Sequence, residues 1–211
     1  MAERSGEFGT NRPYKMSFTS GGLLLNESIA VAALHKHGED WTQTLVHAME
    51  QETTSLPKAA SNRRTLREIV NRLSTLGAEE IDFLRGTAER QEQQYLLWLA
   101  TCRAYRFVRE FAVEVICDRY LSYQLALPLE SFDTFFAAKA DWDDGLASIS
   151  ETTRRKLRQI LFRMMREASI ISEDHRIQST CLSNPLRELI EANTPTDLAV
   201  FPGIAIKGAD Q

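Results

Sequence analysis

The segment Glu89–Leu121 constrains the fold more than any other part of the chain, because it is apolar on more than one helical face. Aliphatic and aromatic side chains follow one another there without the one-sided spacing of a surface helix. A helix that is hydrophobic nearly all round is covered by neighbours on several sides. We therefore expect one broken helix, or two in series, at the buried centre of an all-α fold. Its aromatic residues, Trp98 and Phe111 among them, are interpreted as core and not as platforms for stacking bases.

Shorter amphipathic segments, separated by glycine and proline, surround this centre. The clearest has apolar residues at positions 66, 69, 70 and 73, the i, i+3, i+4, i+7 spacing of one helical face. Two short extended pieces on either side of a polar turn predict at most one short β-hairpin, near residues 170–178. The helices that we expect outside the centre span residues 23–37, 40–53, 62–76, 78–85, 131–140, 150–168 and 185–192.

The same pattern divides the chain into five parts. We expect a disordered or tag-like start, an N-terminal helix-turn-helix-like domain, central buried helices, a C-terminal winged-helix-like domain and a loose tail. Their boundaries are predicted at residues 1–15, 16–86, 87–128, 129–192 and 193–211.

Positive charge is concentrated in two segments of a chain whose net charge is −4. Lys58–Arg72 contains five basic residues and one acid, and Ser150–Ser169 contains six basic residues and two acids. The acidic total argues mildly against a general nucleic-acid coat protein. Two basic islands in an acidic remainder nevertheless suggest that these segments have a negatively charged partner.

Each basic segment is predicted to form a helix with its charges pointing away from the core. At 100° per residue, the apolar stripe defines the buried side, and arginine, asparagine and glutamine fall mostly opposite it. Arginines on such helices can neutralise DNA phosphates, while Asn71 and Gln159 could reach base edges. The alternative is that both are ordinary solvated faces, since Arg and Lys are good helix formers. The predicted DNA-binding residues are Lys58, Arg63, Arg64, Arg67, Asn71, Arg154, Arg155, Arg158, Gln159 and Arg166.

Phe162 also falls on the outer side of the second basic helix. An aromatic residue on a solvated face is unusual. It either packs on another segment or marks a surface for a protein partner.

Catalytic and metal-binding patterns are weak. His35 and His37 are two residues apart, which separates them on a helix. Asp141, Asp143 and Asp144 could suggest a metal-dependent nuclease, but aspartates are also common in the turn before a helix, and we favour the turn. We find none of the common catalytic motifs. We therefore expect no enzyme activity, no cofactor, no metal and no small-molecule substrate.

The cysteine and hydropathy patterns indicate a cytoplasmic protein. Three cysteines without CxxC spacing form neither a disulfide framework nor a zinc site. The longest apolar runs are six residues, whereas a membrane span needs about 20. We expect no contact with a membrane.

Several sequence blocks resemble the BrxA family of bacteriophage-exclusion (BREX) defence systems. They are Met16–Ser28, Tyr95–Ala100, Phe111–Val115 and Leu157–Ala168 with the Ile-Ile-Ser that follows. The resemblance covers roughly residues 15–192. It implies a small all-helical component of an antiviral defence system, with helix-turn-helix or winged-helix character and affinity for double-stranded DNA. It supplies no active-site residues.

The function expected from residues and resemblance together is therefore non-enzymatic binding of double-stranded DNA in phage resistance, with other BREX proteins as further partners. Two alternatives remain open. The basic helices could bind acidic surfaces of partner proteins, which would make the chain an adaptor within the defence complex. A likeness of the family to NusB-type antitermination proteins keeps an RNA-binding regulator open as well.

Overall fold

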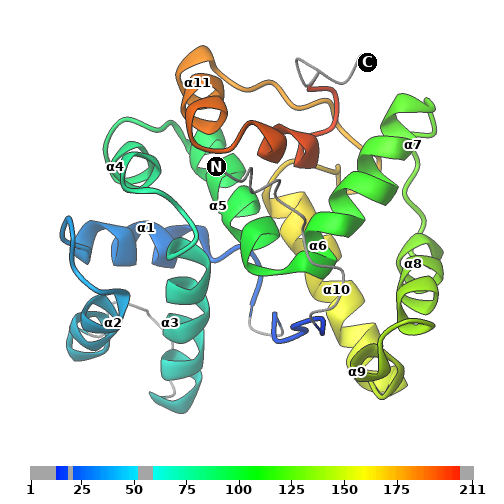
Figure 1. The fold of residues 1–211 in the computed structure, drawn as a ribbon, viewed down its shortest axis with the longest axis horizontal. Helices are drawn as coiled ribbons and strands as arrows, with labels where there is room; N and C mark the ends of the chain where they lie inside the picture. Colours follow the sequence, from blue (N-terminus) through cyan, green and yellow to red (C-terminus); the bar gives the residue numbers. More distant parts are fainter. Residues whose placement is uncertain (1–12, 19–20, 52–58, 205–211) are drawn as a thin grey trace, which may run out of the picture.

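The computed structural model describes residues 13–18, 21–51 and 59–204, and the regular elements within them are helices joined by loops (Figure 1). The α-helices are α1 (Leu25–Leu34), α2 (Trp41–Glu50), α3 (Ala59–Leu73), α4 (Ala78–Gly86), α5 (Arg90–Ala104), α6 (Arg106–Phe111), α7 (Asp118–Leu121), α8 (Glu130–Ala140), α9 (Asp144–Ala147), α10 (Glu151–Glu167) and α11 (Asn184–Asn193). A π-helix, η1 (Ala112–Cys117), joins α6 to α7, and a 3₁₀ helix, η2 (Pro195–Val200), follows α11.

Helix α5 is the centre of the fold, as its apolar sequence predicts. Every side chain from Tyr95 to Cys102 is buried. Helices α1–α4 lie on one side of α5 and α6–α10 on the other (Figure 1). The break that we expected in the long segment falls at Tyr105, whose extended backbone separates α5 from α6.

Helix α3 packs against α1, α2 and α5 through the stripe read from its sequence. Leu66, Ile69 and Leu73 are fully buried, and Val70 is half-buried. The helix begins at Ala59, before the start expected at residue 62, and ends at Leu73. The buried stripe leaves the other side of α3 facing outward.

Helices α8 and α10 complete the C-terminal half. Phe132 and Phe135 of α8 pack on Phe107 and Phe111, with ring centroids 5.2 to 6.2 Å apart. Helix α10 begins where the sequence predicts, because the Ser150 hydroxyl accepts a hydrogen bond from the Thr153 amide at 3.3 Å.

The hairpin expected near residues 170–178 is reduced to one antiparallel bridge between Ile171 and Ile177. A second bridge joins Arg176 to Ala126 in the loop before α8. The described residues contain isolated bridges but no strand of two or more paired residues, and the fold is all-α. The winged-helix and helix-turn-helix descriptions remain predictions.

The loose tail predicted from residue 193 is wrong for residues 195–204. Leu198, Val200 and Phe201 are almost fully buried. The Val200 carbonyl accepts a hydrogen bond from the Trp98 indole at 3.1 Å. Residues 205–211 lie outside the described residues.

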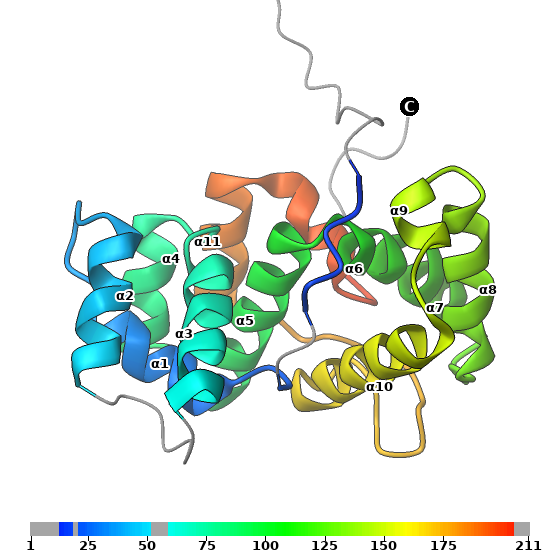
Figure 2. The same ribbon diagram turned by 90° about the horizontal axis from the view of Figure 1, so that it is seen from below.

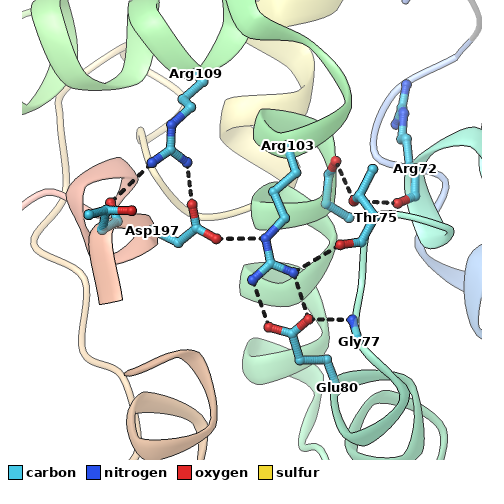
Figure 3. Close-up of polar contacts among 9 residues, drawn as sticks. Arg72, Thr75, Gly77, Glu80, Arg103, Arg109 and Asp197 are labelled. Carbon is cyan, nitrogen blue, oxygen red and sulfur yellow. Dashed lines mark hydrogen bonds and ion pairs between the residues drawn. The ribbon is translucent and has the colours of Figure 1, made fainter. Parts of the chain in front are cut away.

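A buried ionic network holds this C-terminal segment (Figure 3). The Arg103 guanidinium donates to both Glu80 carboxylate oxygens, at 2.6 and 2.8 Å, and to Asp197 at 2.6 Å. Asp197 also accepts a hydrogen bond from Arg109. The network joins α4, α5, α6 and η2, which explains why a polar-looking tail becomes part of the core.

The disordered or tag-like start predicted for residues 1–15 is wrong where the structure describes it. Tyr14 is half-buried, and its ring packs edge-on against Phe107 with centroids 5.8 Å apart. Its hydroxyl donates a hydrogen bond to Glu110. Residues 1–12 lie outside the described residues.

Candidate nucleic-acid interface

The outward side of α3 carries three exposed arginines, Arg63, Arg64 and Arg67. On a regular helix these positions fall within an arc of about 100°, with Arg64 and Arg67 pointing away from the apolar stripe and Arg63 on its flank. Within the described part of the chain, none of the three forms an ion pair. They are therefore available to a negatively charged partner.

The acidic residue of α3, Glu68, does not lie on this exposed face. Glu68 is 7% exposed, and its Oε1 lies 2.6 Å from Nε of Arg72, which is 2% exposed. The other carboxylate oxygen accepts a hydrogen bond from the Tyr105 hydroxyl at 2.5 Å. Because Glu68 is buried and neutralised, the exposed face of α3 carries only positive charge.

Asn71, predicted to reach base edges, is hydrogen-bonded within the protein. Its Oδ1 accepts a hydrogen bond from Nζ of Lys15 at 2.5 Å, and its Nδ2 donates to the Tyr105 hydroxyl at 3.4 Å. Both ends of the amide are therefore occupied within the protein. The direction of the side chain follows from residues remote in sequence, which a helical wheel does not contain.

Lys58, the remaining candidate of the first basic island, lies outside the described residues.

On the side of α10 that faces the protein, the positive charges of the arginines are largely neutralised by carboxylates. Nε of Arg154 lies 3.6 Å from Oδ1 of Asp133 on α8, and Arg158 donates a hydrogen bond to Oδ2 of the same carboxylate. Nε of Arg166 lies 3.4 Å from Glu173. Arg158 and Arg166, which the helical wheel places opposite the apolar stripe, are therefore paired with acids on other elements, as is Arg154.

The remaining basic residues of α10 do face outward. Arg155, Lys156 and Arg163 are exposed, as is the neutral Gln159. Arg155 pairs with Glu151 and Arg163 with Glu167, each one turn away along the helix. Such exposed pairs are weak, so a phosphate could displace the carboxylates, but they lower the net charge of this surface. It is consequently less positive than the face of α3.

Phe162 does not mark a partner surface. It is 2% exposed, and its ring lies edge-on to His175 with centroids 5.1 Å apart. The turn between the bridged residues 171 and 177 covers it, which is the packing alternative weighed from the sequence.

The two basic helices share one side of the molecule. Seen from below, α3 and α10 lie on either side of the N-terminal segment that includes residues 13–18 (Figure 2). The structure thus leaves the two predicted elements separated by this segment (Figure 2). It leaves α3 as the more strongly cationic of the two.

The acidic turn at residues 141–145 behaves as a helix cap. Asp143 accepts a hydrogen bond from the Leu146 amide at 2.8 Å, at the start of α9. Asp141 and Asp144 are exposed. Among the described residues, no three histidine, cysteine, aspartate or glutamate side chains are placed to share a metal ion.

His35 and His47 each contact other side chains of the protein. The His35 ring stacks on Trp41 with centroids 3.8 Å apart, and its Nδ1 lies 2.7 Å from the Thr44 hydroxyl. Burial lowers the pKa of His35 below its ordinary value. Nδ1 of His47 lies 3.4 Å from Glu39.

The model of the BrxA family matches residues 12–194 of the chain. The chain belongs to the BrxA family. Membership implies a component of a BREX phage-defence system, with other components of that system as partners. No curated protein matches it.

The fold also occurs in a solved structure, the crystal structure of an uncharacterized protein from Magnetospirillum magneticum. The two superpose with a TM-score of 0.74 at 22% sequence identity, and the match covers 90% of this chain and 98% of that one. At this identity the similarity establishes the fold alone. In the described part of the chain, no helix is both long and apolar enough to span a bilayer.

Proposed function

We propose that this BrxA-family chain is a non-enzymatic, cytoplasmic component of BREX defence that binds double-stranded DNA through the exposed face of α3. The observation that carries the proposal is the trio Arg63, Arg64 and Arg67, exposed and without a carboxylate partner among the described residues. Burial of Glu68 leaves no acid of the same helix to compete with a phosphate.

Phosphate contacts would supply most of the affinity. Each arginine that neutralises a phosphate releases a condensed counterion, so binding weakens as salt rises. Such contacts fix the protein on the duplex without reading its sequence. Since both ends of the Asn71 amide are occupied, the proposed interface reads little base identity on α3.

Charge reversal on the two helices tests the proposal. The double variant Arg63→Glu/Arg67→Glu is expected to lose binding to a fluorescent duplex at 100 mM salt, measured by anisotropy. Arg155→Glu/Lys156→Glu on α10 changes the charge equally and is expected to retain most of the affinity. Circular dichroism confirms that both variants fold. Full binding by the α3 variant together with loss of binding by the α10 variant would refute the assignment to α3.

An adaptor function has one observation in its favour. Leu121, Tyr123 and Trp142 are large apolar residues with 75%, 91% and 91% of their surface exposed. Exposed apolar groups of this size often serve protein contacts. If a complex with other BREX proteins survives nuclease treatment while the isolated chain binds no duplex, the adaptor function replaces DNA binding. Competition of duplex DNA with a structured RNA separates the RNA-binding alternative.

A further inference from the structure

The N-terminal segment connects the two halves of the fold. At its start, the Tyr14 amide donates to Oδ2 of Asp143 at 3.1 Å, and the Arg106 guanidinium lies 3.8 Å from the centroid of the Tyr14 ring. At its end, the Leu23 amide donates to Glu167 of α10 at 2.5 Å. The segment is thus fixed to the C-terminal half at both ends.

The same segment is also fixed twice to α3. Lys15 donates to Asn71, and the Gly22 carbonyl accepts a hydrogen bond from Arg72 at 2.9 Å. Between these two points, the fully buried Phe18 packs edge-on against Tyr105, with centroids 5.3 Å apart. We call the described residues 14–18 and 21–23 the clasp.

The clasp places a cation at the end of the arginine face of α3. Asn71 follows Arg67 by one turn, a rise of about 6 Å along the helix. Lys15 is exposed, and its Nζ contacts Asn71 at 2.5 Å. The ammonium group therefore extends the row that Arg63 and Arg67 begin, although Lys15 lies far from them in sequence.

We propose that Lys15 is a phosphate contact of the same DNA interface, and that Tyr14 is a positioning residue which holds it there. The inference rests on the proposed function. It adds a contribution from outside α3 and makes DNA affinity depend on the anchoring of the clasp to the C-terminal half.

Lys15 is held in place by contacts that do not neutralise its charge. Its hydrogen-bond partner, the Asn71 amide, is neutral. The Tyr105 ring lies 5.6 Å from Nζ, within the range of a cation–π contact, which does not neutralise the charge. Within the described residues, no carboxylate lies within ion-pair distance of it. A side chain already held near its bound position loses less entropy when a ligand arrives.

Removal of this one charge tests the contact. Lys15→Gln is expected to bind a duplex several-fold more weakly, and the slope of log K against log salt should become shallower by about 0.9, the value for one phosphate. Lys36→Gln removes an exposed lysine at the turn after α1 and should leave affinity and slope unchanged. An unchanged slope for Lys15→Gln overturns the inference. If Arg63→Glu/Arg67→Glu still loses binding in that case, the proposed function stands.

A double-mutant cycle tests the positioning role of Tyr14. Tyr14→Ala should weaken DNA binding in the parent protein and have little further effect in the Lys15→Gln background, because it acts through Lys15. Tyr14→Phe removes only the hydroxyl contact to Glu110, and it replaces Tyr14→Ala in the cycle if the alanine variant does not fold. Equal losses in both backgrounds would show that Tyr14 does not position Lys15.

Discussion

Arg72 and Glu68 lie one turn apart on α3 and form an ion pair that is almost completely buried, with Nε 2.6 Å from Oε1. The pair receives further hydrogen-bond partners from outside the helix, since Arg72 donates to the Gly22 carbonyl and Glu68 accepts from Tyr105. It joins α3 to the clasp and to the end of α5. The same burial leaves the outward face of α3 without an acid.

Glu68→Gln is expected to destabilise the protein strongly. It leaves the Arg72 guanidinium buried without its counter-ion, which typically costs about 3–5 kcal/mol. Urea denaturation at pH 7 measures the loss. Glu151→Gln removes the acid of an exposed pair on α10 and is expected to cost less than about 1 kcal/mol. Equal stability losses in the two variants would show that burial of the α3 pair is unimportant.

Asp197→Asn should loosen the C-terminal segment. The substitution removes the negative charge shared by Arg103 and Arg109, both partly buried, and a cost of about 3–5 kcal/mol is typical of a broken buried pair. Hydrogen exchange should rise in residues 195–204. Asp82→Asn, which affects an exposed pair with Arg85, is the control. Unchanged exchange in the Asp197 variant would contradict the role given to the network in Figure 3.

The three cysteines should differ sharply in reactivity. Burial raises the pKa of the Cys117 thiol to about 12 and raises that of Cys102 well above its ordinary value, so both are protonated at pH 8. Cys181 is exposed. Iodoacetamide at pH 8 should therefore add one label to the native protein, at Cys181, and three after denaturation. Rapid labelling of Cys117 in the native state would contradict its burial.

His35 should make stability depend on pH. Its pKa in the folded protein is lowered by burial, so the unfolded chain binds more protons between the folded and unfolded pKa values. Stability from this residue is present above the unfolded value, about 6.5, and falls as the pH drops below it. Urea denaturation of the parent and of His35→Gln at pH 5 and pH 7.5 isolates the effect. A parent protein that gains stability at pH 5 relative to the variant would contradict it.

The local pattern predicts much of the fold but little of the pairing between distant elements. The period of the apolar residues places α3 and α10, and the apolar character of the central segment on several faces places α5. Ser150 caps α10 at the predicted start of that helix. The pairing of Arg158 with Asp133 depends on how α8 packs on α10. A helical wheel describes one helix at a time, so it could not detect that partner.

The two ends of the described chain show the same limit. Residues near Tyr14 and Asp197 have polar, proline-containing sequences without amphipathic periodicity. Their order comes from contacts with the central helices, through Phe107 for Tyr14 and through Arg103 for Asp197. The π-helical turn of η1 likewise has no signal in the apolar pattern.

The salt dependence of duplex binding tests the central claim most directly. The parent protein should show a log K against log salt slope that becomes shallower by about 2.7 when Arg63, Arg64 and Arg67 are all changed to Gln, since each phosphate contact contributes about 0.9. Changing Arg155, Lys156 and Arg163 of α10 to Gln in the same way should change the slope much less. If the α3 triple variant keeps the parent slope and affinity, the arginine face of α3 does not bind DNA.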